Sequence, residues 1–372
     1  MSDAAQPPRK RSRQPHLEDD AELGRYDDSA FVEHPSLYYD DGNVNLSCEN
    51  TLFRVHRSIV SKHSPVLCDI LTSNEHEDRK PDILRGCLDV PLDETKEDAE
   101  VLLKIVYNDF RVESLKFAAS ELSLLSSAFR MATKYRIEPT LTEIYTRIQD
   151  RWPSVLDQHY KRSTIEKTLG VRRPLIFVRR PPGDSLRAAT STVAKGRNDV
   201  PQATTSMHPA HIIALLREAG CNDSSLLTPL FYASTCMSTR VGEHGRALEV
   251  LPPTDFARYV RGQERIRSYH TRVAVLVPVA DTLGLPDGHV NQCFPAIKSF
   301  WATLADVGVY SNTGEIFATE RDPVEAWAAV RLRLVAAPRP QICGECNQRL
   351  ISRADSIGQV LWSNLPAFFE LG

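Results

Sequence analysis

The chain has 372 residues, of which 42% are hydrophobic and 25% are charged, and its formal net charge at pH 7 is −3. This is ordinary globular composition, and the length suffices for two domains or for one domain with a substantial extension. The net charge is too near zero to imply a nucleic acid or an acidic surface as an obligate partner. No apolar run approaches the roughly 20 residues that a membrane helix needs, so we expect no membrane partner. The eight cysteines are mostly scattered singly, which favours reduced thiols and a cytoplasmic and/or nuclear location.

Residues 1–30 carry almost no large apolar side chains and alternate basic with acidic blocks. Such a segment cannot bury enough surface to offset the entropy cost of ordering it, so we predict a disordered N-terminal tail. Within this tail, the basic run Arg9–Arg13 is either a nuclear import signal or a solvated charge cluster.

Two short segments of alternating hydrophobicity predict a β-hairpin. Apolar and polar residues alternate over 44–48 and, after a polar break, again over 53–56. Because successive side chains of a strand point to opposite faces, we expect Phe53 and Val55 to lie in a core and Arg54 to be exposed.

Helices and one more strand are expected after the hairpin. Ser64 can cap a helix whose first residue is Pro65, and residues 87–92 predict a third strand. Ser120 is the expected cap of a second strong helix. The remaining segments with an apolar stripe at helical spacing are 96–108, 120–136 and 140–152. Residues 31–155 are therefore predicted to form a small domain with a short β-sheet flanked by helices.

The composition changes after this domain. From Lys161 to Arg197 there are ten Lys or Arg residues against two acidic residues, with prolines and Ser/Thr runs and no periodicity. We interpret 156–207 as a basic flexible linker or an insertion. Nucleic-acid binding is the alternative, but the aromatic residues that stack on bases are not interleaved with the charges.

Residues 208–372 are predicted to be mostly helical. Pro209 marks a helix start and Gly220 its end, while the segment 272–280 suits a strand or a helix equally well. The apolar residues of 360–372 would be unusual on a free tail, so we expect this end to pack back onto the domain.

The sequence carries none of the common catalytic motifs: it has no glycine-rich phosphate loop, no G-x-S-x-G elbow and no H-E-x-x-H. His56 and His63 flank a predicted helix that contains Ser58 and Ser61. A Ser/His pairing would also need an orienting acid and an oxyanion site, which the sequence does not supply. We therefore predict that the chain is not an enzyme, assign no catalytic or cofactor-binding residue, and expect His56 to be half-buried where a strand meets a helix.

One local pattern suits a metal. Cys343 and Cys346 have the spacing at which two thiolates can face one zinc ion, and no second Cys pair follows. His289 and Cys293, four residues apart, are the best completion of a Cys3His site. The alternative is a set of reduced structural cysteines. We assign no metal-ligating residue and no cofactor, and whether these four residues bind zinc stays open.

Several motifs together resemble a known family. The stretch "DDGNVNLSCENTLFRVHRSIVSKHSPVLCDIL" closely resembles the opening of BTB/POZ domains, especially the expanded set of basidiomycete fungi. His56-Arg57 is similar to the step from the second strand into the first helix, and Ser64-Pro65 to the turn that starts the next helix. The resemblance covers 36–155 and most of 208–372. Further matches are the "ATKYRI" helix end with Ala132, Lys134 and Tyr135, the "HPAHIIALLREAG" segment, Asp322-Pro323, the Cys-x-x-Cys pair and the "W-x-x-LP-x-FF-x-L" terminus.

The resemblance implies an α+β fold, in which a BTB/POZ domain over 31–155 precedes a mostly helical extension. It also implies a non-enzymatic module that assembles with partner proteins of unknown identity. Two alternatives stay open: a substrate adaptor of a cullin-type ubiquitin ligase, and a nuclear, transcription-related regulator with a structural zinc site. Many BTB domains exchange an N-terminal helix and strand between protomers, and only "SAFVEHPSLYYD" precedes the hairpin here. We therefore expect at most a weak homodimer.

Overall fold

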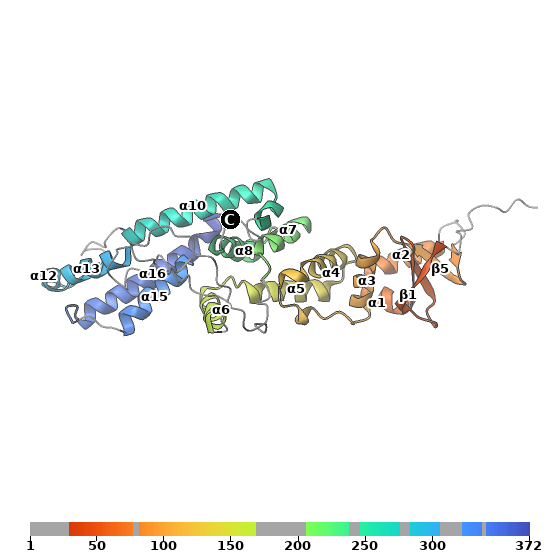
Figure 1. Ribbon diagram of the computed structural model, residues 1–372, viewed down its shortest axis with the longest axis horizontal. Helices are drawn as coiled ribbons and strands as arrows, with labels where there is room; N and C mark the ends of the chain where they lie inside the picture. The colour runs from red at the N-terminus through yellow and green to blue at the C-terminus, as the bar shows by residue number, and fades with distance from the viewer. Residues whose placement is uncertain are drawn as a thin grey trace, which may run out of the picture. The chain divides into compact units, whose positions relative to one another are not determined.

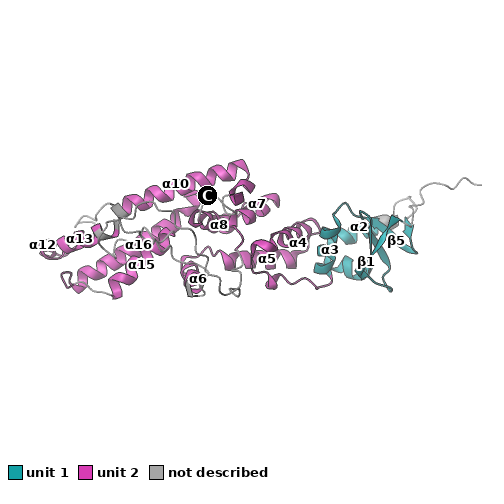
Figure 2. Cartoon of the chain, viewed as in Figure 1, with its two compact units in different colours: residues 1–106 teal, residues 107–372 magenta. Residues whose placement is uncertain are grey.

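The computed structural model describes residues 30–76, 82–168, 206–237, 246–275, 283–305, 322–336 and 340–372. The chain divides into two compact units, residues 1–106 and 107–372 (Figure 2). The sheet lies in the first unit and the second is built of helices, so the predicted α+β class is confirmed. The predicted tail, apart from its last residue, lies outside the described residues, and so does most of the predicted linker.

The first unit contains a five-stranded sheet in the order β1-β3-β2-β5-β4. Strands β2 and β3 form the predicted antiparallel hairpin, β1 pairs parallel with β3, and β5 pairs parallel with β2. The sequence does not predict β1, because it contains Pro35. As an edge strand, β1 tolerates a residue that cannot donate a ladder hydrogen bond. The strands are β1 (Val32–Tyr38), β2 (Val44–Cys48), β3 (Thr51–Val55), β4 (Ile83–Leu84) and β5 (Cys87–Pro91).

Both faces of the hairpin are covered. Phe53 and Val55 are completely buried, as predicted. Arg54 is half-buried rather than exposed, because its Nε donates a hydrogen bond of 2.8 Å to the carbonyl oxygen of Gly42. All five residues of β2 are buried, so simple alternation overstates how much of this sheet meets solvent.

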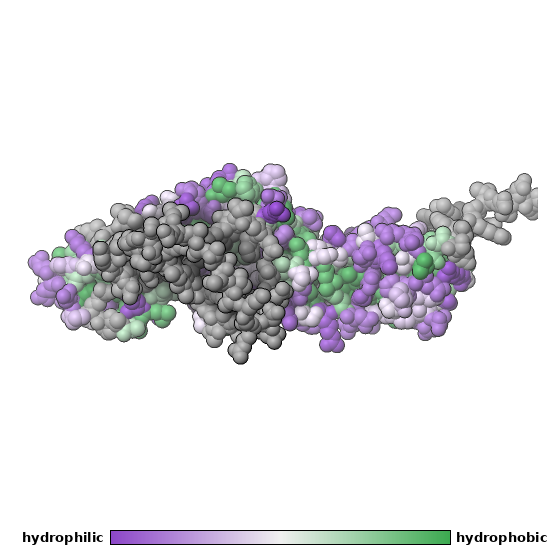
Figure 3. All heavy atoms as spheres, in the orientation of Figure 1, coloured by the Kyte–Doolittle hydropathy of each residue, from purple (hydrophilic) through white to green (hydrophobic). Residues whose placement is uncertain are grey.

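Three helices accompany the sheet: α1 (Arg57–His63), α2 (Pro65–His76) and α3 (Lys96–Val106). Ser64 caps α2 as predicted, since its Oγ accepts the backbone N–H of Leu67 at 3.1 Å. Helix α1 packs against α2 and α3. Hydrophilic side chains cover most of the visible face of this unit, and hydrophobic ones are scattered among them (Figure 3).

The second unit begins with elements that differ in two places from expectation. Helix α4 starts at Leu122 rather than after Ser120. The reason is that the carboxylate of Glu121 folds back to accept the backbone N–H groups of Lys116 and Ala118, which holds a 3-10 turn before the helix. The first 13 residues of the segment predicted as a linker form helix α6. The elements are η2 (Val112–Ser114), η3 (Ala119–Glu121), α4 (Leu122–Lys134), α5 (Glu138–Arg151) and α6 (Leu156–Thr168).

The remaining helices of the second unit bear out the predicted helix start and end signals. Pro209 is the first residue of α7, and Gly220 follows the helix with a left-handed φ of 74°. Helix α10 enters the ambiguous segment 272–280 and is helical as far as Val275, while 276–280 lie outside the described residues. The elements are α7 (Pro209–Glu218), α8 (Ser224–Cys236), η4 (Leu248–Val250), α10 (Pro253–Val275), α12 (His289–Gln292), α13 (Phe294–Ala305), α15 (Pro323–Ala336) and α16 (Gly344–Phe368).

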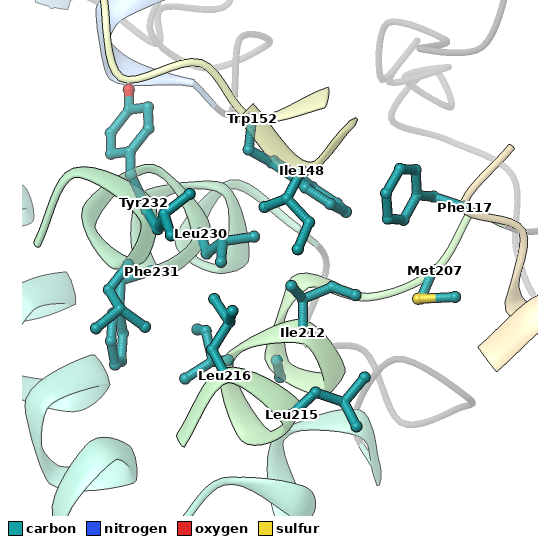
Figure 4. Close-up of a cluster of buried hydrophobic side chains, with 14 of the residues drawn as sticks. Phe117, Ile148, Trp152, Met207, Ile212, Leu215, Leu216, Leu230, Phe231 and Tyr232 are labelled. Atoms are coloured by element: carbon teal, nitrogen blue, oxygen red, sulfur yellow. The ribbon is translucent and has the colours of Figure 1, made fainter. Parts of the chain in front are cut away.

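Two buried hydrophobic clusters hold the second unit together, and α16 contributes to both. One cluster joins α4, α5, α7, α8 and α10 to the C-terminal half of α16; Figure 4 shows Ile148, Leu216 and Leu230 among its members. The other joins α13 and α15 to the N-terminal half of α16. The expected docking of the C-terminal end is confirmed, because Leu361 and Phe369 are fully buried.

Helices α12 and α13 lie at the end of the second unit away from α7 and α8 (Figure 1). Helix α16 packs along α15 and α10. None of the helices in the described ranges is both long enough and apolar enough to cross a membrane.

Candidate metal centre

Two short segments, 289–293 and 343–346, bring one histidine and three cysteines together at one end of the second unit. His289 is the first residue of α12, and Cys293 lies between α12 and α13. Cys343 is the N-cap of α16, and Cys346 lies in its first turn. These four residues are called the Cys3His cluster below.

The ligand atoms of the Cys3His cluster all lie within 4.8 Å of one another. Nδ1 of His289 lies 3.3 Å from Sγ of Cys343, 3.3 Å from Sγ of Cys346 and 4.0 Å from Sγ of Cys293. Zn–S and Zn–N bonds of about 2.3 and 2.0 Å, arranged as a tetrahedron, separate the ligand atoms by about 3.5–3.8 Å. The three separations from Nδ1 of His289 bracket this range, which fits ligands of one shared tetrahedral zinc ion.

The backbone around the cluster accounts for this arrangement. Gly288 adopts a left-handed φ of 87° directly before α12, a conformation that costs glycine little. This turn starts α12 at the point where His289 meets the N-terminus of α16. A Cys-x-x-Cys segment across a helix N-terminus then places both thiols on the side where the free backbone N–H groups lie.

The helix N-terminus also affects the protonation of the thiols. The backbone N–H of Cys346 donates to Sγ of Cys343 at 3.5 Å, and this hydrogen bond lowers the pKa of the Cys343 thiol. Burial raises the pKa of the Cys346 thiol. A bound zinc ion would require both thiols to be deprotonated and would itself supply the positive charge that favours the thiolates.

The cluster has an inner and an outer side. Cys293 and Cys346 are 4% and 0% exposed and belong to the hydrophobic cluster of α13, α15 and α16. His289 and Cys343 are half-buried. Four protein ligands complete the coordination of zinc and leave no position for water or substrate, which is typical of structural rather than catalytic sites.

Sequence reasoning singled out all four residues but assigned none of them as a ligand. The Cys-x-x-Cys spacing is a signal that can be read locally in the sequence. No sequence pattern indicates that His289 and Cys343, which are 54 positions apart in the chain, lie close together. The fold brings all four together. Among the described residues, they are the only group of three or more His, Cys, Asp or Glu side chains that could hold a metal ion.

The histidine at the junction of strand and helix behaves as expected from the sequence. His56 is half-buried between β3 and α1. Its Nε2 lies 3.1 Å from Oδ1 of Asp41, and its ring packs against Tyr39. The hydrogen bond with His56 lowers the pKa of the Asp41 carboxyl. These contacts support a structural role at the junction.

A second buried polar group, centred on the carboxylate of Asp322, was not predicted from the sequence. Oδ1 of Asp322 accepts a hydrogen bond of 2.5 Å from the hydroxyl of Tyr232, and Oδ2 lies 3.0 Å from Nε2 of His159. The backbone N–H groups of Val324 and Glu325 also donate to Oδ1. The side chain of Asp322 is 2% exposed. The Asp-Pro step signals a helix start, but nothing in the sequence identifies the partners from α6 and α8.

This polar group ties helices together. It links α6 and α8 to the start of α15, and the ring of Trp362 on α16 packs on His159 with ring centroids 4.8 Å apart. The carboxylate already accepts four hydrogen-bonding groups. We therefore interpret this arrangement as an interhelical contact rather than a catalytic site.

Comparison with known proteins yields no relative: no family model, no curated protein and no solved structure matches the chain. The similarity to BTB/POZ domains therefore rests on the sequence motifs alone. The assignment of the Cys3His cluster as a candidate metal centre rests on the distances between its ligand atoms.

Proposed function

We propose that the chain is a non-catalytic protein-interaction protein whose helical unit holds one structural zinc ion in the Cys3His cluster. The observation that carries the metal site is the convergence of four ligand atoms within 4.8 Å of one another. The four side chains come from two separate segments, 289–293 and 343–346, and two of them, Cys293 and Cys346, are buried.

The donor set selects zinc among the common biological metals. Three sulfur donors and one imidazole suit a borderline-soft ion that accepts a tetrahedron. Calcium and magnesium prefer oxygen donors, which this cluster lacks. Iron–sulfur clusters generally take four thiolates, and the mixed Rieske type takes two histidines.

The role proposed for the ion is structural. It would tie His289 and Cys293, at α12, to Cys343 and Cys346 at the start of α16. Because α16 also packs against α10 and α15, the ion would hold one end of the helix that contributes to both hydrophobic clusters.

The interaction role is supported by the BTB/POZ-like motifs and by the architecture of the first unit, in which helices accompany a small sheet. Its edge strands β1 and β4 carry the exposed residues Val32 and Ile83, and sheet edges are common sites of peptide addition. We propose protein partners and at most weak self-association. None of the features described above favours the cullin-adaptor alternative. The Cys3His cluster fits the structural zinc site that the alternative of a nuclear regulator includes.

The metal content of the purified full-length chain tests the zinc site. We expect close to one zinc ion per chain by mass spectrometry of the elements, and a large loss on Cys346→Ser. Cys68→Ser is the matched control, because Cys68 lies on α2 outside the cluster. A reduced chain that holds no zinc and takes none up from solution would exclude the site.

Affinity purification with identification of bound proteins tests the interaction role. Recovery of specific partners through residues 1–106 would support it, and copurification of a cullin would favour the adaptor alternative. Reproducible turnover of a substrate, abolished by a single substitution, would contradict the non-catalytic role.

A further inference from the structure

We propose that the Cys3His cluster is a peroxide-sensitive switch, in which oxidation of Cys343 and Cys346 to a disulfide releases the zinc ion. This inference rests on the proposed zinc site. It adds a regulatory role to an ion that would otherwise serve the fold alone.

The first argument is access. Cys343 is half-buried, at the N-cap of α16, whereas Cys293 and Cys346 are 4% and 0% exposed. A small oxidant that approaches from solvent therefore meets Sγ of Cys343 before it meets either of the other two sulfur atoms. Oxidation is selective for cysteines that combine thiolate character with exposure.

The second argument is the position of the resolving thiol. Cys346 lies three residues after Cys343 on the first turn of α16, and its N–H already donates to Sγ of Cys343 at 3.5 Å. The two sulfur atoms lie within 4.8 Å of each other. Cys-x-x-Cys is the motif of disulfide oxidoreductases, in which two neighbouring thiols interconvert with a disulfide. Cys293 comes from a different segment and has no such local closure.

The oxidation balances with hydrogen peroxide as the only co-reactant. The Cys343 thiolate attacks one peroxide oxygen, the O–O bond breaks, and a sulfenic acid and hydroxide form. The Cys346 thiolate then attacks the sulfenic sulfur, the S–S bond forms, and a second hydroxide leaves. Two protons convert both hydroxides to water. The two thiolates lose two electrons in total, and the peroxide gains them.

Zinc release follows from the ligand count. The disulfide removes two of the four donors and leaves only His289 and Cys293, which lie four residues apart beside α12. Two ligands do not hold zinc in a structural site, which takes four. Loss of the ion would separate the segment of α12 from the N-terminus of α16.

The experiment uses the full-length, zinc-loaded chain with hydrogen peroxide and a chromogenic zinc chelator. We expect one equivalent of zinc to be released and peptide mapping to find a Cys343–Cys346 disulfide. A thiol reductant with added zinc should restore the metal content. In Cys343→Asp, a carboxylate keeps a zinc ligand but removes the exposed thiol, so we expect release to slow by about tenfold or more. Cys68→Ser should release zinc at the unmodified rate.

The outcomes separate the two proposals. A chain that holds no zinc before oxidation overturns both. A chain that holds zinc and keeps it under peroxide leaves the structural site intact and overturns the switch. Release accompanied by a disulfide to Cys293, or by sulfonic acid alone, also overturns the switch. The disulfide map of the unmodified chain decides the matter even if Cys343→Asp does not fold.

Discussion

Nδ1 of His289 lies 3.3 Å from Sγ of Cys343, although 54 positions separate the two residues along the chain. The two residues belong to different helices: His289 begins α12 and Cys343 caps α16. The secondary structure of neither helix therefore requires the two side chains to meet. Their contact brings a nitrogen and a sulfur donor close to the separation of about 3.5 Å that a shared zinc ion imposes.

Removing zinc is expected to destabilise the helical unit. Free zinc at 1,000 times its dissociation constant adds about 4 kcal/mol to the stability of a folded protein that binds it. With about 2–4 °C of melting temperature per kcal/mol for a unit of this size, we expect the midpoint to fall by roughly 10 °C on chelation. Calorimetry with and without the chelator measures the shift. Cys346→Ser is the control, and its midpoint should be the same with and without added zinc. A fall on chelation as large in this variant as in the unmodified chain would contradict the prediction.

Gly288→Ala is expected to weaken zinc binding. Gly288 has a φ of 87°, and a Cβ at this position would meet no atom within 4 Å. The cost is therefore backbone strain alone, about 1–2 kcal/mol, and shifting φ to relieve it would move His289. We expect zinc affinity to fall by about tenfold, measured by competition with a chelator of known affinity. Gly344→Ala is the matched control, since Gly344 also has open space and lies next to Cys343, without the left-handed φ. Equal losses in both variants would contradict the explanation.

Asp89→Asn is expected to stabilise the sheet unit at neutral pH. Asp89 on β5 is 5% exposed and accepts a hydrogen bond from Ser47, and burial raises the pKa of its carboxyl. Its Oδ1, and Oδ1 of its in-register neighbour Asn45, have no hydrogen-bond partner among the described residues. A buried carboxylate beside an unpaired oxygen is costly, whereas an amide supplies N–H donors and carries no charge. The expected gain is about 1 kcal/mol.

The pH dependence follows from the same raised pKa. The folded state retains the proton of Asp89 to a higher pH than the unfolded chain does, so this residue makes stability fall as pH rises from the unfolded pKa through the folded one. Asp89→Asn should remove that fall in urea unfolding curves between these two values. Asp41→Asn is the control on an exposed carboxyl whose pKa is lowered, so its contribution has the opposite sign. An unchanged pH slope in Asp89→Asn would contradict the prediction.

Tyr232→Phe is expected to loosen the contact of α8 with α15. The hydroxyl of Tyr232 donates to the buried carboxylate of Asp322 at 2.5 Å. Losing a hydrogen bond to a buried charged group costs about 1.5–3 kcal/mol, measured by urea unfolding. Tyr145→Phe is the control, because Tyr145 packs edge-on against the ring of Phe129 and keeps that contact without its hydroxyl. A cost for Tyr232→Phe as small as that of the control would contradict the proposed role of Asp322.

The sequence by itself determined the elements that local chemistry specifies. Alternation predicted the hairpin that contains Phe53, a Ser-Pro step predicted the start of α2 at Pro65, and Gly220 marked the end of α7. These signals are readable because a side-chain hydroxyl, a fixed proline φ or a left-handed glycine acts within a few residues of its position.

Only the tertiary structure decided the contacts between distant segments. It brought His289 to Cys343, joined His159 to Asp322, and paired β1 with β3 despite Pro35. Partners separated by tens of residues leave no periodicity in the chain, since their meeting depends on how whole helices and strands pack. The Cys-x-x-Cys pair was therefore visible as half of a site and His289 and Cys293 as its suggested completion, but only the fold shows that the four ligand atoms lie within 4.8 Å of one another.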